Sequence, residues 1–298
     1  MRSTRLAVAL VGAALVASCS LFVDLSDLSN GECAVGCTDA QTVDALAADA
    51  SGPTRESGTP NDASSSNETS TGDGACPSTP GPVMLSAGSF CIDSTEVTST
   101  DYIAFFAAVG GASGAVTRPD GCHWKTTNAT GCSNGPAFPI GCVDWCDAFA
   151  YCAWAGKRLC GSVEDGGVLP FPFAGVNTES EWSAACSPTG EPYPYGASFQ
   201  PGACDTKLAD GGPAPGAVAV GSLPKCVGGI PGLFDMAGNV EEWIDSCNDV
   251  DGGPKDPCHE GGDSFAFKQT GVARCDNADS DERDLQDPSV GFRCCADR

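Results

Sequence analysis

Lysine, arginine and histidine are scarce in this sequence. Its 298 residues include 15 lysines and arginines against 39 aspartates and glutamates, which gives a formal net charge of −24. Such a chain lacks the cationic surface that holds nucleic acid or anionic lipid headgroups. The two histidines, His123 and His259, lie far apart, and no Ser-His-Asp set, nucleophile elbow or phosphate-binding loop is present. These absences argue against nucleic acid as a partner and against the common hydrolase classes.

Long hydrophobic runs are also rare, and the one that stands out lies at the N-terminus. Arg2 and Arg5 precede an apolar run, Leu6–Val16, that contains no acidic residue. A positively charged start, followed by an apolar run too short to span a bilayer, is typical of an export signal. We therefore expect the protein to leave the cytoplasm.

The export signal ends in Val16-Ala17-Ser18-Cys19, which resembles the lipobox of bacterial lipoproteins. The resemblance implies a lipoprotein signal peptide at residues 1–18 and a lipid on the Cys19 thiol. The predicted location is the bacterial cell envelope, with the membrane as a partner through this anchor. Ser20 at the next position favours the outer membrane over the inner one. Ordinary cleavage that leaves Cys19 as a free thiol is the alternative.

Aromatic residues are nearly absent between residues 19 and 80. This segment is rich in Ser, Thr, Asp, Ala and Gly, so it cannot bury enough apolar area to offset the entropy lost on ordering. We predict a lipidated, disordered tether at 19–80. All five tryptophans follow Cys76, and no second linker or internal repeat interrupts the rest. Residues 81–298 are therefore predicted to form one domain.

Cysteine, in contrast, is abundant. The chain has 19 cysteines, and 18 of them can pair with one another once Cys19 carries lipid. So many cysteines in an exported chain indicate disulfides, although the connectivity cannot be read from the sequence. Glycine, proline, asparagine and aspartate interrupt the chain every few residues. These features predict a loop-rich fold stapled by disulfides.

A few helices are still predicted. The most regular pattern runs from Asp144, a suitable N-cap, to residue 155, with Gly156 placed to end it. A second helix is expected after an N-cap at Ser99 or Thr100. A short third one is expected to begin near Thr178, which has capping-box spacing to Glu181.

The stretch Gly232–Trp243 fits neither the helical nor the strand period. Asp235, Gly238 and Asn239 all favour turn conformations. Asp235 and Glu242 are hard oxygen ligands, and with carbonyl oxygens of the turn between them they have the composition of a calcium site. A tight turn pinned by a buried Trp243 is the simpler interpretation.

The same stretch, Gly-Leu-Phe-Asp-Met-Ala-Gly-Asn-Val-Glu-Glu-Trp, resembles the signature G-[LV]-[YF]-D-M-x-G-N-V-x-E-W of the sulfatase-modifying-factor family, the family of the formylglycine-generating enzyme. Further segments resemble its other motifs in the right order, from about Met84 to Cys294. Among them, Gly261-Gly262-Asp263-Ser264-Phe265 resembles R-G-G-S-[WF]. The others include 89–106, 139–145, 153–159, 178–182, 192–196 and 290–294.

The resemblance implies an α+β fold, the sulfatase-modifying-factor variant of the C-type-lectin-like fold, often with bound calcium. The calcium ligands that it implies here are the side chains of Asp235 and Glu242 and the carbonyls of Gly238 and Val240. Glu241 stands where the family usually has tryptophan. A second calcium site in the preceding loop matches poorly at 204–206.

The resemblance does not extend to the family's chemistry. In the aerobic enzymes two cysteines just after the G-G-S-W segment hold copper(I), as suits soft thiolates. The matching segment here, Phe265–Arg274, contains no cysteine, so copper is not predicted. A related branch uses non-haem iron held by imidazoles, which two distant histidines do not supply. We therefore predict a non-catalytic module that binds an unknown protein or glycan. An oxidoreductase that generates formylglycine, using cysteines elsewhere in the chain, is the alternative.

Overall fold

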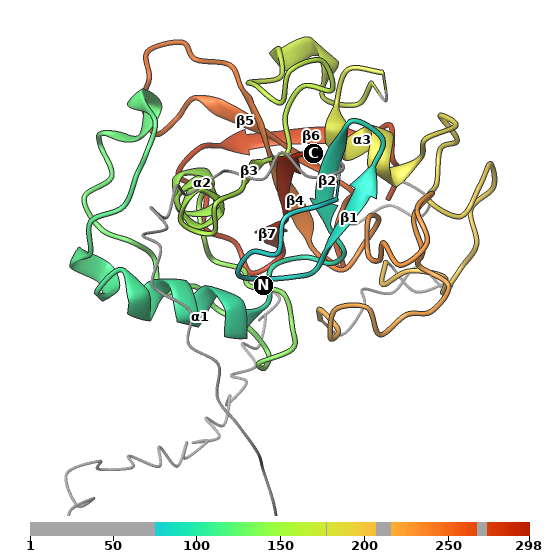
Figure 1. Cartoon of the computed structure of the whole chain (residues 1–298), viewed down its shortest axis with the longest axis horizontal. Coiled ribbons are helices and arrows are strands. Elements are labelled where there is room, and N and C mark those ends of the chain that lie inside the picture. Colours follow the sequence, from blue (N-terminus) through green and yellow to red (C-terminus); the bar gives the residue numbers. More distant parts are fainter. Residues whose placement is uncertain (1–74, 177, 207–215, 267–272) are drawn as a thin grey trace, which may run out of the picture. The chain divides into compact units, whose positions relative to one another are not determined.

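Two four-stranded sheets form the frame of the computed structural model (Figure 1). The structure describes residues 75–176, 178–206, 216–266 and 273–298. They belong to a unit that runs from Asn67 to Arg298. The predicted signal peptide, Cys19 and nearly all of the predicted tether lie outside the described residues, so these assignments stay predictions.

The first sheet has the strand order β1-β2-β8-β3, and its neighbouring strands are antiparallel. The second has the order β6-β5-β4-β7, in which only β4 and β7 run parallel. Because β7 and β8 follow one another in the chain, the C-terminal residues connect the two sheets. The strands are β1 (Met84–Ala87), β2 (Phe90–Asp93), β3 (Arg158–Leu159), β4 (Glu241–Cys247), β5 (Pro257–Gly261), β6 (Ala278–Glu282), β7 (Val290–Phe292) and β8 (Cys294–Asp297).

The longest described helices, α1 and α2, lie on one side of the domain, and α3 lies on the other beside β1 and β2 (Figure 1). The predicted helix at 144–155 is α2, with Asp144 as its N-cap and Gly156 just beyond its end at a φ of +71°. The helices are α1 (Ser99–Ala108), α2 (Trp145–Trp154), α3 (Glu181–Cys186) and the short 3₁₀ helices η1 (Gly111–Ser113), η2 (Asp120–Cys122) and η3 (Phe171–Phe173).

Two helix starts differ from the prediction. Thr98, not Ser99 or Thr100, caps α1, because its hydroxyl and the Asp101 side chain form a capping box. Ser180, not Thr178, caps α3. The Glu181 carboxylate instead pairs with the Arg158 guanidinium. Local spacing therefore located both helices but misplaced their first residues.

The core has an aromatic centre between α1, α2 and β7. The rings of Tyr102, Phe105, Tyr151 and Phe292 are fully buried and contact one another at centroid separations of 5.3–6.5 Å. A second buried group packs around Trp182 of α3, on the side of the domain that holds β2. Such burial is the main favourable term for a domain with so few regular elements.

Disulfides supply the rest of the framework. Every cysteine after Cys37 is paired, so the predicted disulfide-stapled, loop-rich α+β architecture is confirmed. The eight bridges are Cys76–Cys91, Cys122–Cys146, Cys132–Cys142, Cys152–Cys294, Cys160–Cys295, Cys186–Cys275, Cys204–Cys226 and Cys247–Cys258.

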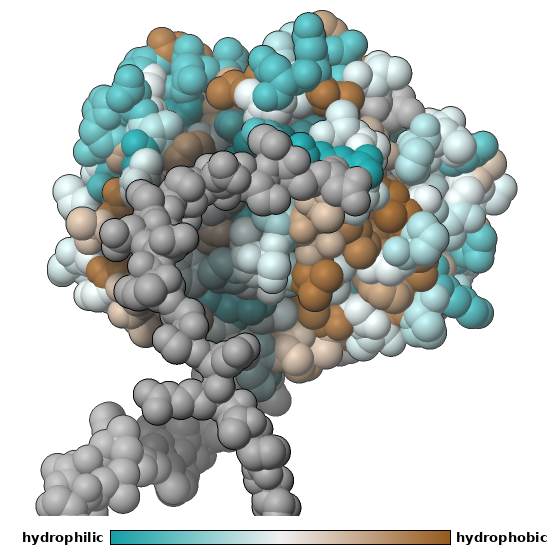
Figure 2. Space-filling view, viewed as in Figure 1, coloured by the Kyte–Doolittle hydropathy of each residue, from teal (hydrophilic) through white to brown (hydrophobic). Residues whose placement is uncertain are grey.

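The visible surface is mostly hydrophilic, and apolar side chains gather only in small groups (Figure 2). Large apolar side chains that are exposed are scattered along the described chain, at Val83, Ile103, Val168, Phe173, Val176 and Val250. Isolated residues of this kind do not mark an interface. Within the described residues, no helix has both the length and the apolar character to cross a bilayer.

Candidate functional site

The stretch Gly232–Trp243 forms a tight turn that leads into β4. Asp235, Gly238 and Asn239 all have φ between +59° and +79°, as their preference for turns predicts. A Cβ at Gly238 would lie 2.4 Å from the carbonyl oxygen of Asp205. Glycine is therefore needed here both for the backbone conformation and for the close approach of the neighbouring loop. Trp243 is fully buried, as the simpler interpretation of the stretch expected.

Asn239 connects this turn to three other parts of the chain by hydrogen bonds. Its side-chain amide donates to Glu96 Oε1 at 2.8 Å, and its side-chain oxygen accepts from the Val218 amide at 2.9 Å. Its own amide donates to the carbonyl of Asp205 at 2.7 Å. Each of these bonds is made inside the domain, where an unpaired polar group would be costly. The turn is therefore fixed by long-range contacts.

Glu242 forms a buried ion pair with Arg293. The Arg293 Nε and Nη2 atoms lie 2.6 and 2.7 Å from the two Glu242 carboxylate oxygens, and both side chains are at most 1% exposed. The Trp182 Nε1 group also donates to Glu242 Oε2, at 2.8 Å. The remaining guanidinium contacts go to the carbonyls of Asp93 and Phe234. Arg293 thus connects the stretch to β2 and to the C-terminal end of the chain.

Only one of the two carboxylate oxygens of Asp235 accepts a hydrogen bond from an N–H group. Its Oδ2 accepts from the Gly221 amide at 2.6 Å, whereas its Oδ1 is buried without an N–H or hydroxyl donor, and the side chain lies within hydrogen-bond reach of the Glu96 carboxyl group. Glu96 Oε2, another buried oxygen, has no such donor either. Burial raises the pKa of Asp235 to about 6, and the charge of Glu242 contributes to this rise. Burial and the charge of Asp235 raise the pKa of Glu96 well above its ordinary value.

These contacts bear on the predicted calcium ligands. The adjacent Asp235 and Glu96 carboxyl groups have no cationic hydrogen-bond donor on their Oδ1 and Oε2 atoms, and such oxygens suit either a shared proton or a hard cation. The Glu242 carboxylate is fully engaged by Arg293 and Trp182, so it would have to leave the guanidinium to bind a metal. Within the described parts of the chain, no three His, Cys, Asp or Glu side chains converge on one metal position. None of the predicted ligands Asp235, Gly238, Val240 and Glu242 is tested by these contacts, and the calcium site stays a prediction.

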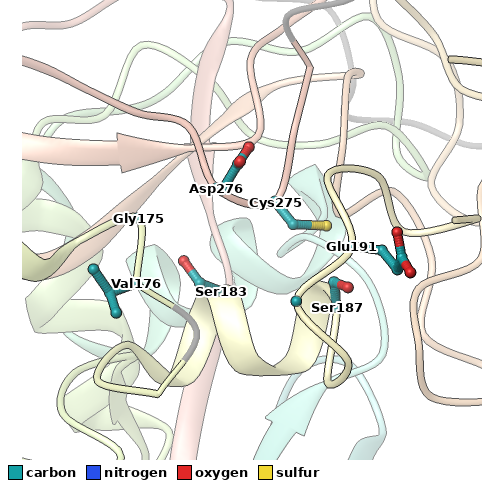
Figure 3. Close-up of a pocket in the computed structure, with 8 residues that line it drawn as sticks. Gly175, Val176, Ser183, Ser187, Glu191, Cys275 and Asp276 are labelled. Atoms are coloured by element: carbon teal, nitrogen blue, oxygen red, sulfur yellow. The ribbon is translucent and has the colours of Figure 1, made fainter. Parts of the chain in front are cut away.

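The cysteines near the family's copper position are engaged in disulfides. Cys275, which follows the cysteine-free segment Phe265–Arg274, is bonded to Cys186. This disulfide lies beside a pocket of about 200 Å³ between α3 and the segment before β6. In Figure 3, Ser183 points into the pocket from α3, and Cys275 and Asp276 face it from the opposite side. The lining mixes polar and apolar groups, and the described residues provide no free thiol there.

The two histidines do not form a site. His123 is exposed and His259 is buried. The His259 Nδ1 atom lies 3.2 Å from Ser246 Oγ, and its ring packs on Phe171 with the centroids 3.8 Å apart. Burial lowers the pKa of His259, so a neutral, packed imidazole is expected.

An acidic face on the second sheet was not found from the sequence. We define it as Glu241, Glu260, Asp263 and Asp279, which come from β4, β5, the residues after β5, and β6. Burial and the charges of Asp263 and Asp279 raise the pKa of Glu241 to about 8. Burial and the charge of Glu241 raise that of Glu260 well above its ordinary value. Only the register of the sheet brings these residues together, so local spacing gave no signal.

A family model described as the sulfatase-modifying factor enzyme 1-like domain matches residues 61–298. The match covers well over half of the chain, so the protein belongs to this family. The predicted fold, the sulfatase-modifying-factor variant of the C-type-lectin-like fold, is confirmed.

The similar proteins include some that are named formylglycine-generating enzyme and others that are named as inactive forms of it. The inactive C-alpha-formylglycine-generating enzyme 2 of Bos taurus is 36% identical over 118 residues, which cover 37% of this chain and 33% of that protein. The formylglycine-generating enzyme of Streptomyces coelicolor is 26% identical over 276 residues, which cover 70% and 78%. The chain spans about a third of the length of the bovine and mouse inactive relatives.

Two solved structures with a similar fold are those of CarF and of PvdO, the second of which is from Pseudomonas aeruginosa. CarF is 19% identical with a TM-score of 0.48, and the match covers 70% of this chain and 86% of that one. PvdO is 21% identical with a TM-score of 0.48, and the match covers 70% and 80%.

Proposed function

We propose that the protein is a non-catalytic binding or structural module of the bacterial cell envelope, built on the scaffold of the formylglycine-generating enzyme. The observation that carries this proposal is the pairing of every cysteine after Cys37 in a disulfide. Copper(I) held as in the family's oxidases needs two free thiolates. The word inactive in the name of the bovine relative supports the same conclusion.

The alternative, an oxidoreductase that generates formylglycine or performs a related side-chain oxidation, would need a disulfide to open. Cys186–Cys275 is the candidate, because Cys275 follows the segment where the copper cysteines would lie. Opening this bridge would supply two thiols beside that segment. This alternative therefore predicts that activity requires reduction of the Cys186–Cys275 disulfide.

Copper(I) titration and a turnover assay with a sulfatase peptide separate the two functions. We expect neither stoichiometric copper binding nor turnover, before or after mild reduction, with the Streptomyces coelicolor enzyme as the positive control. A Cys275→Ser variant tests the remaining route. Stoichiometric copper binding with turnover that Cys275→Ser abolishes would establish the oxidase and overturn the non-catalytic proposal.

The proposed module carries a structural calcium ion with Asp235 as a side-chain ligand. EDTA should then lower the melting temperature of the wild-type protein, and Asp235→Asn should remove most of that effect. Glu242→Gln, the other predicted ligand, is less informative because it also breaks the buried pair with Arg293. Asp276→Asn, which alters an exposed ion pair, is the matched control. A wild-type melting curve that does not change with EDTA would contradict the calcium site.

The lipid anchor is proposed from residues 1–19 alone. Radiolabelled palmitate should be incorporated by the wild-type chain in a bacterial host and not by Cys19→Ser. Fractionation of the membranes then tests the expected outer-membrane location. Label retained by Cys19→Ser would refute Cys19 as the lipidation site.

A further inference from the structure

The acidic face carries an inference about a second cation site, separate from the one predicted at Asp235. Glu260 pairs in register with Trp243 on β4 and with Asp279 on β6. Directly paired residues of neighbouring strands share a face of the sheet, as do residues two apart in one strand. Glu241, Glu260 and Asp279 therefore lie on one face, and Glu242 on the opposite one.

The carboxylates at the centre of this face are buried and have no neutralising partner among the described residues. Glu260 is 1% exposed, and both of its oxygens lack a hydrogen-bond partner. Asp263 is 3% exposed with a free Oδ1, and its Oδ2 accepts only a 3.3 Å bond from the Asn277 amide. None of the four acids forms an ion pair with a lysine, arginine or histidine of the described residues. Buried carboxylates in this arrangement need a proton or a cation.

The composition of the face also differs from the family's pattern. Glu241 stands where the motif usually has tryptophan, and Glu260 stands where R-G-G-S begins with arginine. Asp263 separates Gly262 from Ser264 in the same motif. Three departures from two motifs are thus all acidic, and the fold brings them to one place. A change of ligand chemistry at that place accounts for all three together.

We propose that Glu260, with Glu241 and Asp263, binds a hard divalent cation of the calcium class. Carboxylate oxygens are the ligands that such ions prefer, and calcium tolerates irregular geometry and water in the remaining positions. Because no three acidic side chains of the described residues already converge on one point, the ion draws at least one carboxylate inward as it binds. Asp279, which is exposed, lies at the rim where the ion enters.

Calorimetric titration of the full chain with calcium chloride at neutral pH tests the site. The variants are Glu260→Gln, Asp235→Asn and, as a control of equal charge change, Glu282→Gln at an exposed position of β6 that pairs with Lys255. We expect Glu260→Gln to remove one binding event or weaken it at least tenfold. Asp235→Asn should leave that event unchanged, and so should Glu282→Gln. If Asp235→Asn loses calcium binding and Glu260→Gln does not, the ion binds at the calcium site of the proposed function, and the site at Glu260 is overturned.

Melting curves supply a second readout that a purely structural role would not give. Without calcium, Glu260→Gln should melt higher than the wild type, because it removes a buried carboxyl group that must be either held charged or protonated at a cost at neutral pH. With calcium, the wild type should gain stability and this variant should not. An unchanged calcium isotherm in Glu260→Gln would overturn the site. So would a fall in its calcium-free melting temperature, because that result would indicate that the Glu260 carboxylate already has a cationic partner in the folded chain.

Discussion

Arg293 contributes to the stability of this domain through buried contacts that its neighbours in the sequence do not reveal. Its guanidinium is fully buried and bonds to Glu242 and to carbonyls of β2 and of the turn. Replacing one partner of a buried ion pair leaves an uncompensated charge, which costs about 3–5 kcal/mol. Arg293 therefore stabilises both the turn and the contact between the two sheets.

Arg293→Met should lower the free energy of unfolding by about 3–5 kcal/mol, because it leaves Glu242 charged and buried. Urea unfolding with the disulfides intact measures the effect. Arg274→Met is the matched control, since Arg274 and Asp276 form an exposed pair worth at most about 1 kcal/mol. Equal losses in the two variants would contradict the role given to Arg293.

The sequence predicted the residue-scale features that depend on neighbours in the chain. The turn at Asp235, Gly238 and Asn239 follows from their backbone preferences. The engagement of Glu242 could not be foreseen, because Arg293 lies 51 residues away. For the same reason the acidic face was missed: Glu241 and Glu260 meet only through the sheet.

At the scale of elements, the helix signals were reliable and their exact starts were not. Asp144 and Gly156 bound α2 as predicted, whereas the N-cap of α1 was predicted at Ser99 or Thr100 and lies at Thr98. Thr98 is the N-cap because Asp101 completes a capping box with it. Adjacent hydroxyl residues offer the same chemistry, so sequence alone does not decide between them.

Thr98→Ala should destabilise the protein by about 1 kcal/mol, the usual effect of losing an N-cap hydroxyl. Thr98→Ser keeps the hydroxyl that bonds to the Asp101 amide and carboxylate, so it should remain near wild type. Thermal melting of the two variants measures the difference. A loss in Thr98→Ser as large as that in Thr98→Ala would indicate that packing of the methyl group matters more than the cap.

Two neighbouring disulfides, Cys152–Cys294 and Cys160–Cys295, connect α2 and β3 to the last strand. Their sequence separations are 142 and 135 residues, yet each closes a ring of only about ten residues while the other is intact. Removing either pair alone should cost about 3 kcal/mol. Removing both should cost about 7 kcal/mol, more than the sum, because the second loss opens a loop of roughly 55 residues even with Cys186–Cys275 intact.

Cysteine-to-alanine pairs in urea unfolding test this non-additivity. The Cys132–Cys142 bridge, with a separation of 10 residues, is the control, and its removal should add to either single loss. Simple additivity of the two long-range bridges would contradict the explanation.

At the scale of the whole molecule, buried acids set the response to pH. Burial raises the pKa of Asp245 and of Asp263 to about 6, and the pKa of Glu241 to about 8. Between pH 4 and 8 the folded state therefore holds protons that the unfolded chain has released. Since stability falls with pH wherever the folded state binds more protons, these groups stabilise the fold most at mildly acidic pH.

In EDTA, the melting temperature should be higher at pH 5 than at pH 8. Calcium should recover part of the loss at pH 8, because a cation replaces the protons. Scanning calorimetry across this range measures both effects. Maximum stability at pH 8 in EDTA would contradict the raised pKa values.

The disulfide connectivity has a consequence for biogenesis. Under the proposed export the chain enters an oxidising compartment with its N-terminus first. Cys152, Cys160 and Cys186 then arrive well before their partners, the last of which, Cys295, stands three residues from the C-terminal residue, Arg298. An oxidase that joins cysteines in order of arrival would produce the wrong bridges. Production of this protein therefore depends on a disulfide isomerase, whose reshuffling takes seconds to hours.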